Sequence, residues 1–237
     1  MRLSDPDVVA REYADERGLA ARKAAYRWAH GPDARELAFG AVAEVAPRRY
    51  LEVGCGEGEF AQRVQEELGC EVVAVDQSKR MIELTRARGV DARVGDVQEL
   101  PFEDEAFDCA AANWMLYHVQ RLERGLAELR RVLRPGGRLV AATNSVRHLS
   151  ELWELVGLDY RAAREFSAES GGAELGRHFD RVERRDVEGT LVFPDRDAVV
   201  AYFASTVLFK DRAAAVPPFE GPFTATRRNV VFVADKA

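Results

Sequence analysis

A glycine-rich turn and one aspartate are the residues whose types and spacing first suggest chemistry in this chain of 237 residues. Gly54, Gly56 and Gly58 follow the apolar run 50–53. Glycines at a strand-to-helix turn let a ligand approach the backbone closely. Asp76 lies 22 residues after Gly54, at the end of the next apolar run. A carboxylate at that place can accept both hydroxyls of a ribose, so the spacing predicts a nucleoside-containing cofactor.

The form of the glycine turn narrows the class of cofactor. The dinucleotide fingerprint requires a third glycine at position 59, where this chain has Glu59. Glu57 and Glu59 flank the expected start of a helix, where they would repel a pyrophosphate but tolerate a cationic or zwitterionic group. No GxxxxGK[ST] sequence occurs, which excludes a P-loop. The turn therefore favours a charged nucleoside other than a dinucleotide or a nucleoside triphosphate.

Short strand-like runs must hold these residues in place. The runs are short, end near a glycine or a polar residue, and are 50–53, 71–75, 91–94, 107–113 and 138–143. Helical patterns lie between the first and second runs, between the second and third, and between the fourth and fifth. This alternation predicts parallel βαβ units. In the remaining chain, 182–187 and 229–233 are candidate strands, and 197–207 is a candidate helix.

The carboxyl ends of parallel strands meet at one edge of a sheet, and ligands bind there. The residues expected at this edge are Glu52 with Gly54, Asp76, Asp96, Asn113 through His118, and Asn144. His118 is either a general base, since imidazole titrates near neutral pH, or a hydrogen-bonded structural histidine. Both interpretations of His118 stay open.

Composition limits the compartment and the partners. Lys and Arg number 34 against 40 Asp and Glu, and the resulting net charge of −6 makes nucleic acid an unlikely partner. No apolar run reaches ~18 residues and no secretory signal is recognisable, so we expect no membrane partner. Three cysteines in no metal-binding pattern predict a reducing, cytoplasmic location and no bound metal.

Several ordered blocks between residues 48 and 146 are similar to the class I S-adenosylmethionine-dependent methyltransferases. The resemblance is to the subgroup that contains ubiquinone-biosynthesis and natural-product enzymes acting on small molecules. The blocks are Leu51–Gly58, Val75–Ser78, Gly95–Val97 with Leu100–Phe102, Phe107–Asp108, and Leu133–Gly137.

The resemblance implies S-adenosylmethionine as cofactor, S-adenosylhomocysteine as product, and a role for each matched residue. The Gly54–Gly58 loop would pass under the methionine part. At the methionine end, Glu52 would be oriented towards the amino group, and Asn113 would contact the same ammonium. Asp76 would hold the ribose, with Gln77 beside it in the same site. Asp96 and the backbone of Val97 would contact the adenine.

The resemblance also implies an α/β fold, a Rossmann-like doubly wound sheet of seven strands with the last one antiparallel. We expect a single domain with an N-terminal helical cap (1–46), a cofactor-binding core (47–146) and a C-terminal half (147–237). The segment 190–222 would be an insertion before the last strand that can serve as a substrate lid.

The implied reaction is in-line transfer of a methyl group to an O, N or C atom of a small-molecule acceptor. The segment Asn113–Leu116 lacks the prolines typical of enzymes that methylate amino groups of bases, which favours a small organic acceptor. Two alternatives stay open: a binding protein of the same fold without catalysis, and an enzyme that methylates RNA or protein. The aromatic residues of the C-terminal half either line an apolar acceptor pocket or form core; they are Trp153, Phe193, Tyr202 and Phe203.

Overall fold

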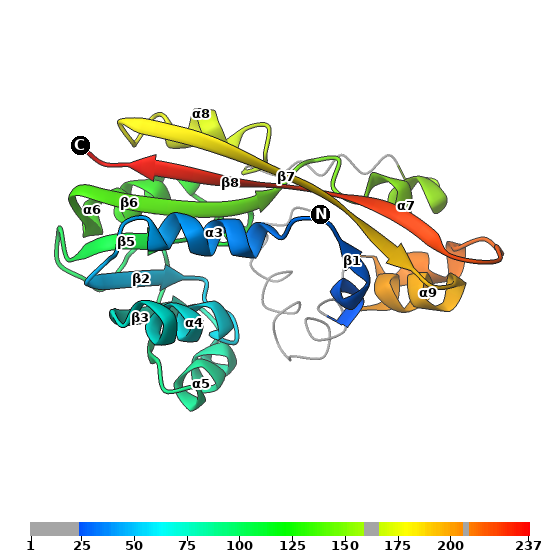
Figure 1. Ribbon diagram of the computed structural model, residues 1–237, viewed down its shortest axis with the longest axis horizontal. Helices are drawn as coiled ribbons and strands as arrows, with labels where there is room; N and C mark the ends of the chain where they lie inside the picture. The colour runs from blue at the N-terminus through cyan, green and yellow to red at the C-terminus, as the bar shows by residue number, and fades with distance from the viewer. Residues whose placement is uncertain (1–23, 159–165, 206–208) are drawn as a thin grey trace.

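The computed structural model describes residues 24–158, 166–205 and 209–237, and its centre is an eight-stranded sheet (Figure 1). The strand order is β1-β7-β8-β6-β5-β2-β3-β4. The first 23 residues of the predicted N-terminal cap (1–46) lie outside the described residues.

Five strands run parallel, as the alternation predicts: β2 (Arg49–Val53), β3 (Glu71–Asp76), β4 (Asp91–Val94), β5 (Phe107–Ala111) and β6 (Leu133–Asn144). The helices α4 (Glu59–Leu68), α5 (Lys79–Ala87) and α6 (Leu122–Val132) connect them. β6 begins earlier than predicted, because Leu133 is already extended and the chain passes Gly136 at a φ of 76°. β5 ends earlier than predicted, at Ala111.

Two long strands close the sheet. β8 (Phe223–Asp235) pairs antiparallel with both β6 and β7 (Arg181–Phe193), which confirms the predicted antiparallel last strand. The predicted count of seven strands was one too low, since β1 (Ala29–His30) adds a short antiparallel edge strand on β7. A two-residue strand has no sequence periodicity of its own that could reveal it.

Helices cover both faces of the sheet. α3 (Ala34–Ala43) and α4 pack on one face, and α6 with α8 (Gly171–Leu175) packs on the other. Small side chains such as Ala38 and Ala41 let α3 lie close to the strands. We call the face under α3 and α4 the α3/α4 face.

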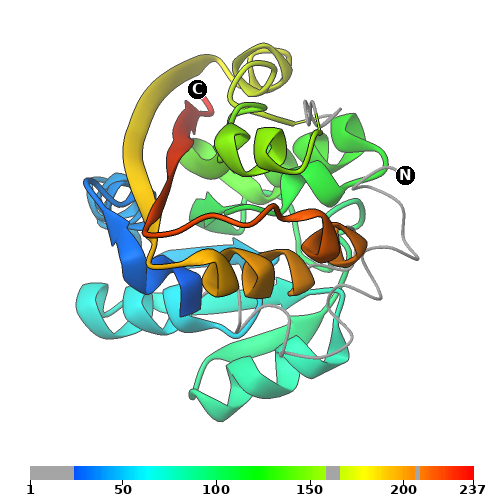
Figure 2. The same ribbon diagram turned by 90° about the vertical axis from the view of Figure 1, so that its right-hand side faces the viewer.

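The β7–β8 pair extends six residue pairs past the last pairing of β6 with β8, roughly 20 Å of strand. On this extension lie η1 (Tyr26–Trp28), α7 (Ser150–Leu155), α9 (Arg196–Ala204) and η3 (Lys210–Ala215), beyond the carboxyl ends of the parallel strands (Figure 2). Trp153, Phe193 and Phe203 are buried in a core of their own here, which supports the interpretation of these aromatic residues as core. The predicted lid segment starts later than expected, because residues 190–193 belong to β7.

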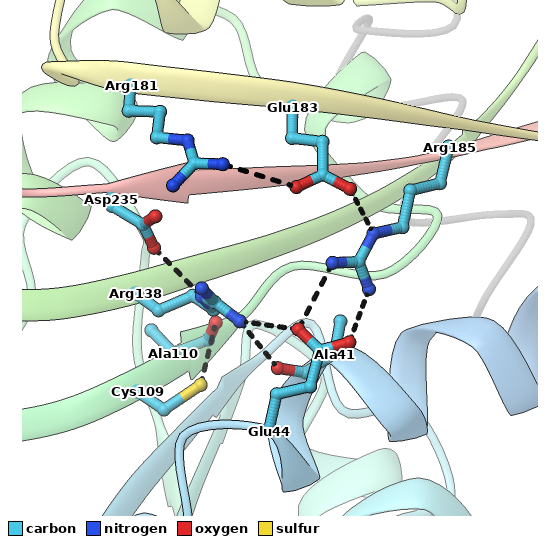
Figure 3. Close-up of polar contacts among 9 residues, drawn as sticks. All are labelled: Ala41, Glu44, Cys109, Ala110, Arg138, Arg181, Glu183, Arg185 and Asp235. Atoms are coloured by element: carbon cyan, nitrogen blue, oxygen red, sulfur yellow. Dashed lines mark hydrogen bonds and ion pairs between the residues drawn. The ribbon is translucent and has the colours of Figure 1, made fainter.

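At the opposite end of the sheet, ion pairs tie α3 to three strands (Figure 3). Glu44, after the end of α3, accepts hydrogen bonds from Arg138 of β6 and Arg185 of β7. Arg138 also donates to Asp235 of β8, and Arg185 to Glu183. Alternating charges on β7 are thus matched within the protein rather than only solvated.

Candidate active site

The turn between β2 and α4 has the backbone geometry that its glycines allow. Gly54, Gly56 and Gly58 have φ angles of 69°, 55° and 76°, in the left-handed region that favours glycine. A Cβ on Gly54 would lie 2.7 Å from the Cβ and Cγ of Met115. A Cβ on Gly56 would meet nothing within 4 Å, so the middle of the turn is open to a ligand.

Asp76, the last residue of β3, supports this turn. Its Oδ2 accepts a hydrogen bond from the backbone N of Gly56 (3.0 Å), and its Oδ1 accepts one from Ser78 N (2.9 Å). Burial raises the pKa of the Asp76 carboxyl, although these bonds work in the other direction. The side chain of Gln77 is exposed beside it. The structure brings the glycine turn and the predicted ribose ligand together.

Glu52 is the most unusual charged group of this edge. It is 3% exposed on β2, one hydrogen bond comes from the backbone of Ala61 in α4, and Oε2 has no partner within the described part of the chain. Burial, together with the nearby charge of Asp76, raises the pKa of the Glu52 carboxyl to about 8. Glu52 is therefore largely protonated at neutral pH unless a cation lies beside it.

Asp96 and Val97 follow β4. Both carboxylate oxygens of Asp96 accept hydrogen bonds from the side-chain amide of Gln98 (3.1 and 3.0 Å), and Val97 is buried. Gln98 in turn accepts a bond from the backbone N of Arg121. Gln98 holds the carboxylate in place, a role that the sequence did not suggest.

Asn113 lies two residues past the end of β5. Its Oδ1 accepts a bond from the backbone N of Ala142 (3.3 Å), while its Nδ2 is buried and unpartnered among the described residues. The next residue, Trp114, has a φ of 53°, which is uncommon for a residue with a large side chain. Such strain is found where the surrounding structure imposes a conformation, often at functional sites.

His118 ends η2 (Leu116–His118), which follows this segment. Its backbone N donates to Met115 O (2.9 Å), and its ring centroid lies 4.4 Å from that of Tyr117. The side chain of His118 is half-buried. The geometry allows either of the two roles stated above.

Sequence reasoning missed part of this edge. Thr85 of α5 donates a hydrogen bond to Gly56 O (3.0 Å) and contacts Gly58, and Asn229 of β8 bonds Asn144 at the end of β6. Asn229 is not at a strand end, because the antiparallel strand β8 crosses the carboxyl edge at the middle of its length. Its signal was composition: a polar residue before the apolar run 230–233.

No group of three or more His, Cys, Asp or Glu residues in the described ranges could hold a metal ion. No described helix is long and apolar enough to cross a membrane.

Part of this chain is similar to a known protein family and to curated proteins. Residues 51–141 match the methyltransferase domain family. A demethylmenaquinone methyltransferase of Renibacterium salmoninarum is 33% identical over 138 residues, which are 57% of this chain and 55% of that protein. The matches with the curated relatives span about half of the length of those proteins.

Solved structures share the fold. An S-adenosylmethionine-dependent methyltransferase of Thermotoga maritima superposes with a TM-score of 0.61 at 23% identity, over 96% of this chain and all of that one. A phosphoethanolamine N-methyltransferase of Haemonchus contortus, solved with S-adenosylhomocysteine, has a TM-score of 0.65 at 17% identity, over 100% of this chain and 60% of that one. The chain thus shares its fold with these solved structures, and its residues 51–141 match the methyltransferase domain family.

Proposed function

We propose that this protein transfers the methyl group of S-adenosylmethionine to a small-molecule acceptor. The observation that carries the proposal is the set of polar groups at the carboxyl edge, in which buried atoms of Glu52 and Asn113 have no partner in the described residues. Buried polar atoms without partners are costly, so a ligand that pairs with them is expected.

The unpaired oxygen of Glu52 fits the ammonium group at the methionine end of the cofactor. An ammonium group can donate to Glu52 Oε2, directly or through water, and the backbone carbonyl of Asn113 can accept from the same group. The open space over Gly56 suits the passage of the cofactor chain. Asp76 would accept from the ribose hydroxyls, beside Gln77.

The adenine end would meet Asp96, which would accept from the adenine amino group, with the Val97 backbone nearby. The side-chain amide of Gln98 already donates a hydrogen bond to each oxygen of the Asp96 carboxylate. A carboxylate has about four lone-pair positions, so capacity for an amino group is left.

The bound sulfonium supplies an activated methyl group, and the protein residues then have to align the acceptor and exclude water. An acceptor that binds as a free amine or a thiolate needs no base. A hydroxyl acceptor benefits from one, and His118 is our candidate for removing its proton. Of the predicted lid 190–222, the described residues 194–205 and 209–222 are proposed to cover the site, because α9 and η3 lie beyond the edge that holds the cofactor residues.

Calorimetric titration with S-adenosylmethionine, S-adenosylhomocysteine and NADH tests the proposal. We expect both sulfur nucleosides to bind, and Asp76→Ala to weaken binding at least about 100-fold, since it removes the ribose ligand and a support of the turn. Binding of NADH alone would indicate a dehydrogenase. Binding of the sulfur nucleosides without turnover of any acceptor would favour a binding protein.

The role of His118 depends on the acceptor. With an oxygen acceptor, His118→Ala should lower kcat by about 100-fold or more while leaving cofactor affinity unchanged. His178→Ala is a control, because that histidine lies between α8 and β7, away from the carboxyl edge. Near-normal turnover by His118→Ala would assign a structural role to this residue.

The proposal includes a cytoplasmic location and no nucleic-acid or membrane partner. It is supported by Cys55, Cys70 and Cys109, which are free and buried, as is usual in a reducing compartment. The net charge of −6 argues against RNA as the acceptor.

A further inference from the structure

The three asparagines of this chain lie together at the carboxyl edge. Asn144 of β6 is paired with Asn229 of β8, and Asn113 follows β5 beside Ala142. The pairing register puts Asn144 and Asn229 on the α3/α4 face, the face of the sheet on which Glu52 also lies. Asparagine is unfavourable in strands, so the direct pairing of Asn144 with Asn229, one strand away from Asn113, points to a role other than folding.

Hydrogen bonds fix the orientation of two of these amides. Asn144 Oδ1 accepts from Trp114 Nε1 (2.9 Å) and from Asn229 Nδ2 (2.6 Å). An indole N–H can only donate, so the atom of Asn144 that faces it must be the oxygen. The same oxygen then requires the NH₂ group of Asn229, which leaves the carbonyl of Asn229 on the other side.

The arrangement leaves one donor group and one acceptor next to each other. Within the described part of the chain, Asn144 Nδ2 and Asn229 Oδ1 form no hydrogen bond. Neither atom is among the fully buried polar atoms that lack a partner. Both hydrogens of the Asn144 NH₂ group and a lone pair of Asn229 are therefore available to a ligand.

A buried arginine near Asn229 favours ligand groups that present oxygen atoms over cationic groups. Arg227, 4% exposed, lies two residues from Asn229 on the same face of β8, about 7 Å away along the strand. Its guanidinium donates to the backbone oxygens of Thr190, His30 and Pro32, and to no carboxylate among the described residues. An uncompensated positive charge disfavours a cationic acceptor.

We propose that Asn144 and Asn229 form the subsite that recognises the methyl acceptor. The subsite fits a neutral group in which a hydrogen-bond acceptor stands beside a donor, such as a carboxamide or a hydroxy-carbonyl. Asn144 Nδ2 donates to its carbonyl oxygen, and Asn229 Oδ1 accepts its N–H or O–H. Trp114 is a positioning residue that holds the Asn144 amide in this orientation. The inference rests on the proposed function, since it names the substrate class of that site.

The side-chain NH₂ groups of the asparagines provide a direct test. Selective ¹⁵N labelling of asparagine gives three NH₂ signal pairs, which single Asn→Asp variants assign. The protein is first loaded with S-adenosylhomocysteine and then titrated with benzamide, which carries donor and acceptor, or with N,N-dimethylbenzamide, which carries the acceptor alone. We expect benzamide to shift the Asn144 signals saturably and to bind about tenfold more tightly than its dimethyl analogue.

Asn144→Asp is the critical variant. Its carboxylate can still accept from Trp114 and Asn229, so the fold is preserved, but the two donors are replaced by an oxygen. Benzamide affinity should fall about tenfold while S-adenosylhomocysteine affinity stays the same. Gln65→Glu, the same change on the exposed side of α4, should alter neither affinity.

The possible results separate the two proposals. Failure of S-adenosylhomocysteine to bind would overturn the proposed function and the subsite with it. Normal cofactor binding with equal affinity for the two benzamides, with no binding of either, or with unchanged benzamide affinity in Asn144→Asp would overturn the subsite alone.

Discussion

Two buried carboxylates at opposite ends of the sheet, Asp108 and Glu52, differ in how many of their oxygens have a hydrogen-bond or ion-pair partner. Asp108, 5% exposed at the start of β5, accepts from the backbone N of Arg48 (2.6 Å) and Arg49 (2.8 Å) and forms an ion pair with Arg134 (2.5 Å). Glu52, 3% exposed on β2, has an oxygen with no partner in the described chain. The two carboxylates are thus buried to a similar degree, but among the described residues only Asp108 has partners for both of its oxygens.

The same contrast extends to the groups around each carboxylate. Near Asp108 the ion pairs of Glu44, Arg138 and Asp235 join α3 to the strands (Figure 3). Near Glu52, Asn113 also has a buried atom without a partner. Unpaired polar atoms, rather than charge or burial alone, distinguish the carboxyl edge of the sheet from its opposite end.

Substitution of glycines with left-handed φ should give the largest difference in cofactor binding between the carboxyl edge and the opposite end of the sheet. Gly54→Ala should weaken S-adenosylmethionine binding at least about 100-fold, because the new methyl group collides with Met115 and distorts the turn. Gly69→Ala has the same kind of φ (64°) at the other end of α4, where a Cβ meets nothing within 4 Å. It should cost only about 1–2 kcal/mol of stability and leave binding unchanged, as calorimetry and denaturant unfolding can check.

Neutralising each buried carboxylate should change stability in opposite directions. Asp108→Asn should lower the free energy of unfolding by about 2–4 kcal/mol, since an amide cannot replace the ion pair with Arg134. Glu52→Gln should be neutral or stabilising at pH 8 in the absence of cofactor, because it removes a buried ionising group. Equal losses in urea unfolding of the two variants would contradict the contrast drawn here.

The raised pKa of Glu52 predicts a pH dependence. The folded state holds this proton up to about pH 8, whereas the unfolded chain loses it near 4.5. The contribution of Glu52 to stability is thus complete below pH 4.5, falls as the pH rises from 4.5 to 8, and is constant above that range.

Cofactor binding should follow the reverse trend. An ammonium beside Glu52 favours the ionised carboxyl, so affinity for S-adenosylmethionine should rise about tenfold from pH 6.5 to pH 8, with release of a proton. Calorimetry in buffers of different ionisation enthalpy measures that proton. Glu52→Gln should abolish both the pH dependence and the proton release, and a persistent release would assign it to another group.

The smallest effect is expected at the ion pairs of Glu44. Hydrogen bonds from Arg185 and Arg138 lower the pKa of this half-exposed carboxyl, which therefore stabilises the fold above its ordinary pKa and loses the contribution as the pH falls. Glu44→Gln should cost less than about 1 kcal/mol, and the loss should shrink at high salt, since exposed ion pairs are screened. Cofactor affinity should not change.

Local sequence signals were sufficient for the parallel half of the molecule. Gly54 and Asp76 were recognisable because β-branched runs end directly at them, and parallel strands deliver their ends to one edge. The antiparallel β8 was expected from the resemblance and its pairing with β7 is confirmed. The edge strand β1, the early start of β6 and the later start of the 190–222 insertion were not predictable, because each depends on pairing with distant residues.

The sequence by itself determined which residues come to the carboxyl edge from parallel strands, since chain direction and strand ends are local properties. Only the tertiary structure decided that Asn229 meets Asn144, that Arg227 is buried near them, and that Glu52 has an oxygen without a partner. The physical reason is that hydrogen bonding and burial depend on neighbours far apart in the chain. Residue type determines what a group can bind, and packing determines whether it is still free to bind it.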